Sequence, residues 1–138
     1  MRTALLAAAL LLLAAPASAA DPVEGEWLTP DGGSKVRIGP CPDKPDRICG
    51  VVSWLPAAKV KDLDSRNPDA ALKTRPIMGV ATVMGFKPAG PGKWNGGKLY
   101  DPASGKTYNG KLTANPNGTL KVEGCVAMIC QAQTWKKG

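Results

Sequence analysis

The chain has 138 residues, with 18 lysines and arginines, 11 aspartates and glutamates, and no histidine. The lack of histidine excludes Ser-His-Asp and Cys-His nucleophiles, an imidazole general base, and histidine-ligated zinc, copper or haem. The length is sufficient for one domain or for two very small ones.

Residues 1–20 have the pattern of a signal peptide. Arg2 provides a basic start, residues 5–15 are all apolar, and residues 17–19 (Ala-Ser-Ala) match the small-x-small cleavage pattern. The apolar run is shorter than the roughly 20 residues that a membrane-spanning helix needs. We therefore predict cleavage near Ala19 or Ala20, which gives an exported protein, periplasmic or secreted, without a transmembrane anchor. Loss of Arg2 lowers the formal net charge from +7 to +6.

Four cysteines in an exported chain are typical of two disulfides. Cys41 and Cys49 flank a polar, proline-rich stretch, and Cys125 and Cys130 flank four residues that could turn a hairpin. These two local pairings are favoured among the three that four cysteines allow. The alternative is a metal site built from all four thiolates, but these spacings are not those of zinc ribbons.

The remaining chain alternates short apolar or β-branched runs with Gly, Pro, Asn and Asp. This pattern predicts short strands joined by turns, and Asn117-Gly118 is the strongest turn signal. Residues 56–75 break the rhythm, and no segment has a 3.6-residue period long enough for a major helix. Strands are expected in residues 23–29, 35–38, 48–55, 77–87, 98–101, 106–114, 119–126 and 129–136.

Eight short strands with short connections predict an all-β domain over residues 21–138. Sequential hairpins favour an antiparallel up-and-down barrel over a sandwich, since closure removes exposed strand edges. An eight-stranded barrel is just wide enough to be filled by side chains or to hold one small ligand.

Several separated motifs give the chain a family resemblance. They are Gly25-Glu26-Trp27, Ile48-Cys49-Gly50, Asn67-Pro68, Arg75-Pro76-Ile77-Met78-Gly79, Trp94-Asn95-Gly96-Gly97-Lys98-Leu99-Tyr100-Asp101-Pro102, Gly105-Lys106-Thr107-Tyr108 and Gln133-Thr134-Trp135. With them the chain resembles the bacterial domain-of-unknown-function 2147 family of small exported proteins. The resemblance implies a calycin-like or lipocalin-like eight-stranded antiparallel barrel. It implies no established activity and no catalytic residues.

The Gly25-x-Trp27 pair is also similar to the opening of a lipocalin. In that fold the tryptophan packs across one end of the barrel under a basic residue near the C-terminus. Lys136 or Lys137 would take this part here, as a structural cation–π contact.

The second cysteine pair indicates which side chains face inward. If Cys125 and Cys130 are bonded across a hairpin, the face that also carries Lys121 and Glu123 is the outer one. The inner face is then Leu120, Val122, Gly124 and Val126, opposite Ile129, Gln131, Gln133 and Trp135. The two glutamines need partners inside. These are either a structural hydrogen-bond network or the polar end of a bound apolar molecule.

The longest predicted strand supports a cavity lining. A strict two-residue period places Met78, Met84 and Phe86 on one face, where flexible methionines either fill the core or line a cavity. Tyr108 and Trp54 would add aromatic walls. The candidate ligand-binding residues are Met78, Met84, Phe86, Tyr108, Gln131, Gln133 and Trp54.

Two functions of different classes are compatible with these residues. The first is a non-catalytic carrier or sensor that holds a small hydrophobic ligand, such as a fatty acid, in a cavity of roughly a few hundred cubic ångströms. The second is a solid barrel whose basic residues 57–75 dock onto an anionic envelope surface or a protein partner.

Other classes of function find little support in the sequence. No cofactor, metal site or nucleic-acid partner is predicted. Asp62, Asp64, Asn67 and Asp69 suggest a calcium loop, but Arg66 occupies a ligand position and no closing glutamate follows. Nothing around Asp62 and Asp64 argues for a raised carboxyl pKa, so an enzyme is not expected.

Overall fold

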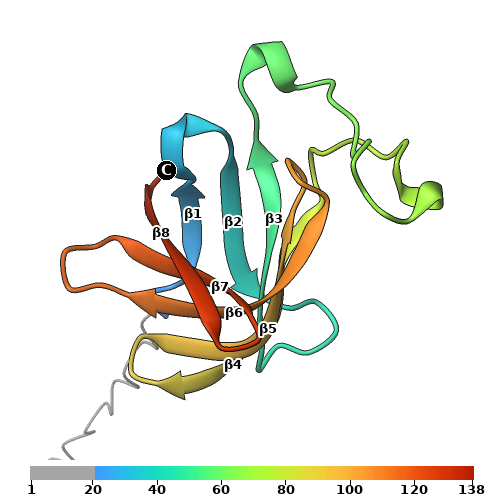
Figure 1. The fold of residues 1–138 in the computed structure, drawn as a ribbon. Coiled ribbons are helices and arrows are strands. Elements are labelled where there is room, and N and C mark those ends of the chain that lie inside the picture. Colours follow the sequence, from blue (N-terminus) through green and yellow to red (C-terminus); the bar gives the residue numbers. More distant parts are fainter. Residues whose placement is uncertain (1–20) are drawn as a thin grey trace, which may run out of the picture.

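The computed structural model describes residues 21–138, and the predicted signal peptide lies outside the described residues. Eight antiparallel strands pair in sequence order and close into a barrel where β8 meets β1 (Figure 1). The predicted eight-stranded antiparallel barrel is confirmed. The strands are β1 (Gly25–Leu28), β2 (Lys35–Pro40), β3 (Ile48–Trp54), β4 (Ala81–Gly90), β5 (Lys93–Asp101), β6 (Lys106–Ala114), β7 (Leu120–Val126) and β8 (Ile129–Lys137).

The up-and-down order gives the barrel two different ends. At the closed end lie residues 21–24, the chain terminus after β8, and the turns β2–β3, β4–β5 and β6–β7. At the mouth lie the β1–β2 connection, the β5–β6 turn, the β7–β8 turn, and residues 55–80 between β3 and β4. We call residues 55–80 the β3–β4 segment; it contains the short helices η2 (Ala57–Lys59) and η3 (Ala70–Leu72). Figure 1 shows this segment, in green, extending away from the strands.

The closed end is packed around Trp27 and Phe86, which are 1% and 0% exposed. The indole Nε1 of Trp27 donates to the backbone carbonyl of Val23 at 2.9 Å. The ring of Phe86 lies against Gly97 and Gly110, where an added Cβ would come within 2.2 and 2.5 Å of ring atoms. These two glycines, paired across β5 and β6, therefore leave the space that the Phe86 ring fills.

Strand β4 departs from the strict two-residue period that the sequence predicted. Its pairing with β3 shifts twice, between Ile48 and Gly50 and between Gly50 and Val51, and each shift adds one residue to β4. Gly85 takes a φ of 69°, which is typical of a β-bulge. As a result Val83 and Phe86 both face the core, whereas Met84 is opposite the exposed Lys98. The prediction that Met84 and Phe86 share a face was wrong, because a bulge reverses the alternation.

Both predicted disulfides are present, Cys41–Cys49 and Cys125–Cys130. The first closes the β2–β3 connection at the closed end. The second closes the β7–β8 turn at the mouth, where Cys125 and Cys130 are cross-strand partners. Within residues 21–138 no cysteine is free.

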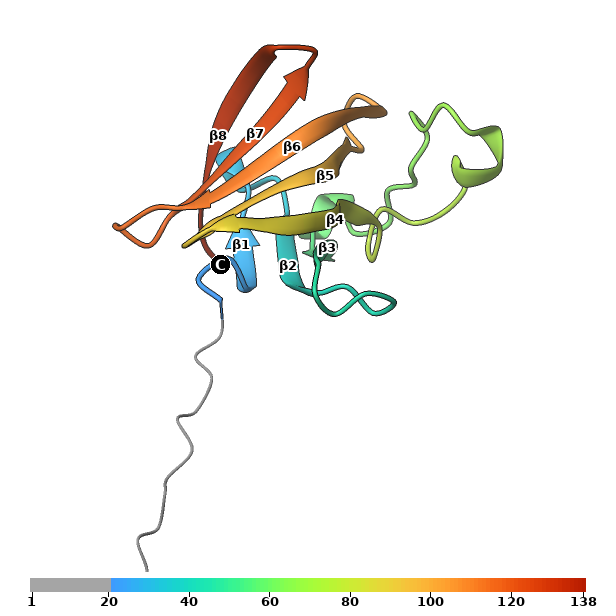
Figure 2. The same cartoon turned by 90° about the horizontal axis from the view of Figure 1, so that it is seen from below.

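Strand β8 closes the barrel over only part of its length. It pairs with β7 from Ile129 to Trp135, but with β1 only through Lys136 and Lys137. The β7–β8 hairpin therefore extends beyond β1, as Figure 2 shows. The prediction that Val126 and Ile129 face the interior was wrong. Their side chains are 65% and 76% exposed, because the hairpin extends beyond the barrel there.

Candidate ligand cavity at the barrel mouth

A cavity of about 690 Å³ opens at the mouth of the barrel. Its apolar walls come from several strands and from the β3–β4 segment, which lies over one side. The larger aliphatic and aromatic lining residues are Val36, Val52, Leu55, Ile77, Leu99, Tyr100, Tyr108, Val122 and Trp135. The volume lies within the range of small-molecule sites, roughly 300–1,000 Å³.

Hydrogen-bonding side chains converge on the cavity from β6 and β8. Gln131 and Gln133 line it from β8, and Tyr108 lines it from β6. Gln133 accepts a hydrogen bond from the indole Nε1 of Trp135 at 3.2 Å, whereas the Gln131 side chain has no hydrogen bond within residues 21–138. Gly124 on β7 lies between Tyr108 and Gln131. It is the pairing partner of Gln131, and an added Cβ there would lie 3.4 Å from Tyr108. The amides of β8 and the ring of Tyr108 thus reach the same space.

Thr82 adds a further hydroxyl to this lining. The side chain is 7% exposed, and its Oγ1 is buried without a hydrogen-bond partner among the described residues. A buried hydroxyl normally finds a partner, since an unsatisfied one costs about 1–3 kcal/mol. It lies in the part of β4 where the register shifts, so the β-bulge brings it to the cavity.

The rim of the cavity is acidic although the protein as a whole is basic. The charged lining residues are Asp31, Asp62 and Asp101, against the single cation Lys59. The Asp101 carboxylate accepts hydrogen bonds from the Ser104 hydroxyl at 2.7 Å and from the Ala103 backbone N–H at 3.1 Å. These bonds hold the Asp101 side chain in place at the rim.

The structure separates the seven candidate ligand residues into two groups. Tyr108, Gln131 and Gln133 line the cavity together. The two glutamines are exposed at its opening and not in the closed interior that the sequence predicted, because β8 extends beyond β1 there. Phe86 lies in the closed-end core, and neither Met78 nor Met84 is part of the lining.

Trp54 is also outside the cavity. It is 39% exposed at the end of β3 and stacks instead under the ammonium of Lys35, 5.4 Å from the ring centroid.

The β3–β4 segment is fixed to the barrel through Asp64, which is fully buried. Its carboxylate accepts hydrogen bonds from the Tyr100 hydroxyl at 2.5 Å, Asn67 Nδ2 at 3.0 Å and Arg75 Nε at 2.9 Å. Arg75 also lies over the Tyr100 ring, 5.9 Å from its centroid. One buried carboxylate thus connects both arms of the segment to β5.

Hydrogen bonding and charge determine the protonation of this group. Burial by itself raises the pKa of the Asp64 carboxyl. The hydrogen bonds from Tyr100, Asn67 and Arg75, with the Arg75 charge, outweigh burial and hold the pKa below its ordinary value of 3.8. Burial, followed by the bond to Asp64 and its charge, raises the pKa of Tyr100 to about 12. The group is therefore a carboxylate bonded to a neutral phenol at neutral pH.

A second contact holds the segment against the β5–β6 turn. Arg66 Nη1 donates to the Ala103 carbonyl at 2.6 Å. Gly105 packs so closely on the Arg66 backbone that an added Cβ would lie 1.9 Å from the Arg66 carbonyl oxygen, and its φ is +72°. Two of the five basic residues of the predicted docking region, Arg66 and Arg75, are therefore used in internal contacts.

Sequence reasoning did not identify Asp64 as a structural residue. Asp62 and Asp64 lie in the same polar stretch, and no local pattern distinguishes the exposed one from the buried one. The only pointer was the Asn67-Pro68 motif, since Asn67 shares the turn with Asp64 and bonds to it. Tyr100, the other partner, is 36 residues away in sequence.

At the opposite end, the Gly25-x-Trp27 motif has the expected cation above its ring. The ammonium of Lys137, not Lys136, lies 4.2 Å from the Trp27 ring centroid. Lys137 also donates to the Glu24 carbonyl at 3.2 Å. The choice between adjacent lysines follows from strand alternation, because Trp27 is the pairing partner of Lys137.

Comparison with known families identifies the chain. Residues 25–137 match the sequence profile of the family described as "Uncharacterized protein conserved in bacteria (DUF2147)". The chain belongs to this family. No curated protein sequence matches it significantly.

The DUF2147 barrel is also similar to a solved structure, a protein of the human pathogen Helicobacter pylori that belongs to the lipocalin family. The two have 22% sequence identity, the match covers 83% of this chain and 82% of that chain, and the TM-score is 0.73. At this identity the likeness establishes the fold alone, which is lipocalin-like. Two disulfides and a bacterial family fit an exported protein.

Two further observations concern membranes and metals. Within residues 21–138, no helix has the length and apolar character needed to span a bilayer. The same part of the chain contains no cluster of three or more acidic or cysteine side chains placed to hold a metal ion.

Proposed function

We propose that this DUF2147 barrel is a non-catalytic binding protein that holds a small hydrophobic molecule in the mouth cavity. The observation that carries the proposal is the 690 Å³ cavity, in which apolar walls converge with Gln131, Gln133 and Tyr108. An apolar cavity with a few convergent polar groups is the usual form of a small-molecule site. The polar end of the ligand would bond to the β8 amides and the apolar part would contact Val36, Val122 and Leu99.

The charges at the rim refine the choice of ligand. A fatty acid would bring its carboxylate close to Asp31, Asp62 and Asp101, with Lys59 as the one compensating cation of the lining. Like charges at short range disfavour binding. We therefore favour an amphiphile with an uncharged polar end, such as a long-chain alcohol, amide or monoacylglycerol, over the free fatty acid expected from the sequence.

The primary test is native mass spectrometry of the exported protein with both disulfides intact, followed by extraction with organic solvent. A reproducible extra mass that leaves with the solvent is expected, and it would identify the ligand class directly. A protein that carries no extra mass and also fails to bind a panel of neutral and acidic lipids would overturn the proposal.

A matched pair of variants locates the site. Gln131→Trp places a large side chain in the cavity, whereas Thr134→Trp places it on the outer face of the same strand, outside the lining. Both positions are exposed, so neither change disturbs the core. We expect Gln131→Trp to lower ligand affinity at least about tenfold and Thr134→Trp to leave it unchanged. Equal effects would place binding elsewhere.

The second candidate function, docking of residues 57–75 onto an anionic surface or protein, has less support. Arg75 is bonded to Asp64 and Arg66 to the β5–β6 turn. The free cations of the segment, Lys59, Lys61 and Lys73, are interspersed with Asp62 and Asp69. A matched test is Lys61→Gln with Lys73→Gln, which would weaken envelope binding only under this alternative.

A further inference from the structure

The tip of the β7–β8 hairpin exposes apolar side chains that nothing in the described chain covers. Val126, Met128 and Ile129 are 65%, 97% and 76% exposed, the highest values among the large hydrophobic residues. The Cys125–Cys130 disulfide closes the hairpin directly beneath them. The cross-link holds the two strands together at that point, so the apolar residues stay gathered in one closed turn.

The position of the tip connects it with the cavity. Ile129 and Cys130 are followed on β8 by Gln131 and Gln133, which line the cavity. The hairpin extends past β1, so its tip is at the mouth end (Figure 2). Any surface that takes up the tip therefore lies beside the cavity opening.

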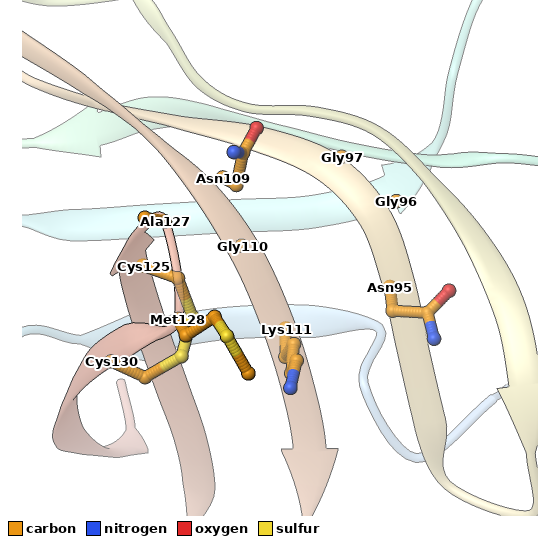
Figure 3. A pocket seen from close by; sticks show the side chains of 10 residues that line it. All are labelled: Asn95, Gly96, Gly97, Asn109, Gly110, Lys111, Cys125, Ala127, Met128 and Cys130. Atoms are coloured by element: carbon orange, nitrogen blue, oxygen red, sulfur yellow. A yellow bond between two sulfur atoms is a disulfide. The ribbon is translucent and has the colours of Figure 1, made fainter.

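The outer face of the sheet next to the tip is basic. Met128 shares a shallow groove of about 570 Å³ with Lys111, Asn109 and Asn95 (Figure 3). The ammonium of Lys98 donates to the Asn109 side chain at the edge of this groove. Lys98 and Lys111 are the outer-face lysines nearest the tip, whereas Lys87, Lys93 and Lys121 lie on the same face of β4–β7 toward the closed end.

Acidic groups do not balance these lysines. On the same outer face of β4–β7 the structure describes one acidic residue, Glu123, which is paired with Lys121 at 3.5 Å. Exposed apolar side chains beside a lysine-rich face are complementary to the interface of an anionic bilayer. There, apolar groups insert among the acyl chains and lysines meet the lipid headgroups.

We propose that the β7–β8 tip docks this protein onto anionic phospholipid bilayers, with Val126, Met128 and Ile129 inserted and the nearby Lys98 and Lys111 on the headgroups. The docking itself does not require the proposed ligand. Its purpose rests on the proposed function, since it places the cavity opening at the membrane, where a hydrophobic ligand enters or leaves without crossing water.

Vesicle flotation tests the docking. The exported protein is mixed with vesicles of phosphatidylcholine alone or of phosphatidylcholine with phosphatidylglycerol, at low and high salt. We expect binding to the vesicles with phosphatidylglycerol, weakening as salt rises, since screening acts on the lysine contribution. Wild-type protein that fails to float with either vesicle at low salt would overturn the proposal.

Two double variants separate the tip from general apolar exposure. Met128→Ser with Ile129→Ser removes the tip, and Val60→Ser with Leu63→Ser removes two similarly apolar, 45% and 46% exposed side chains from the β3–β4 segment. Vesicle binding should fall about tenfold or more in the first variant and stay unchanged in the second. Equal binding of both variants would refute insertion of the tip.

Further measurements distinguish membrane docking from dimerisation through the tip, and this inference from the proposed function. Size-exclusion chromatography that shows a wild-type dimer, which the tip variant converts to a monomer, would assign the tip to a second copy and overturn docking. The tip variant should still bind ligand delivered from detergent, with transfer from vesicles slowed. Vesicle docking without any bound ligand would defeat only the proposed function, and ligand binding without docking would defeat only this inference.

Discussion

The two ends of the barrel are built from the same strands by different means. At the closed end, Trp27 and Phe86 fill the interior, and paired glycines make room for the Phe86 ring. At the mouth, a cavity remains, and the β3–β4 segment at its side is fixed by a buried carboxylate. The closed end is thus stabilised by apolar packing and the mouth by directed polar contacts, which leave room for a ligand.

This division between the two ends lets a small domain keep both stability and an open cavity. Close packing has its highest energetic value where side chains interlock, and it excludes ligand volume by the same contacts. Polar anchoring of a segment needs only a few bonds to one strand. Asp64 reaches Tyr100 on β5 and leaves the neighbouring lining residues free.

The largest expected effect is on the closed end. Phe86→Ala should lower the free energy of unfolding by about 3–5 kcal/mol, because the ring is fully buried and Gly97 and Gly110 cannot fill the space. Urea denaturation with both disulfides intact measures the change. Met84→Ala is the control. Met84 precedes Phe86 by two residues on β4, is half-buried and lies outside the core, so its truncation should lower the free energy of unfolding much less. Equal losses of unfolding free energy in the two variants would show that packing of Phe86 at the closed end has no special part in stability.

The next effect tests the anchor at the mouth. Asp64→Asn should lower the free energy of unfolding by about 2–3 kcal/mol, because Arg75 loses its ionic partner and the Tyr100 hydroxyl loses a charged acceptor. Asp62→Asn, exposed and two residues earlier, should have little effect. Limited proteolysis should detect faster cleavage within residues 55–80 of the Asp64 variant. Unchanged protection would show that other contacts hold the segment.

The same anchor makes the mouth sensitive to acid. The folded-state pKa of Asp64 lies below the ordinary value of 3.8, so its stabilising contribution is complete well above pH 3.8. The contribution is lost as pH falls below 3.8 and through the folded-state pKa. The difference in unfolding free energy between wild type and Asp64→Asn should therefore shrink over that acid range. A difference independent of pH there would contradict the assigned ionic state.

The smallest effect concerns the cation over Trp27. Lys137→Gln should lower the free energy of unfolding by about 0.5–1 kcal/mol, the usual value of an exposed cation–π contact. Lys136→Gln is the matched control and should be neutral, since Lys136 does not lie over the ring. A larger effect of the Lys136 variant would show that the contact with Trp27 does not depend on Lys137.

Much of the fold could be predicted from the sequence because its determinants are local. Turn residues, two-residue alternation and cysteine spacing are properties of neighbouring positions, and they predicted the eight strands, their antiparallel order and both disulfides. The same alternation placed Gln131, Gln133 and Tyr108 on one face, and all three line the cavity. Both glutamines are exposed at its opening and not buried in the interior, because β8 extends beyond β1 there.

The rest depended on contacts between distant residues, which a single sequence does not display. The bulge in β4 moved Met84 to the outer face, and the short pairing of β1 with β8 left Val126 and Ile129 exposed. Asp64 became a buried anchor only because Tyr100 and Arg75 meet it from other parts of the chain. Local physics thus determined the strands and cross-links, and tertiary packing decided which of their side chains enclose the cavity.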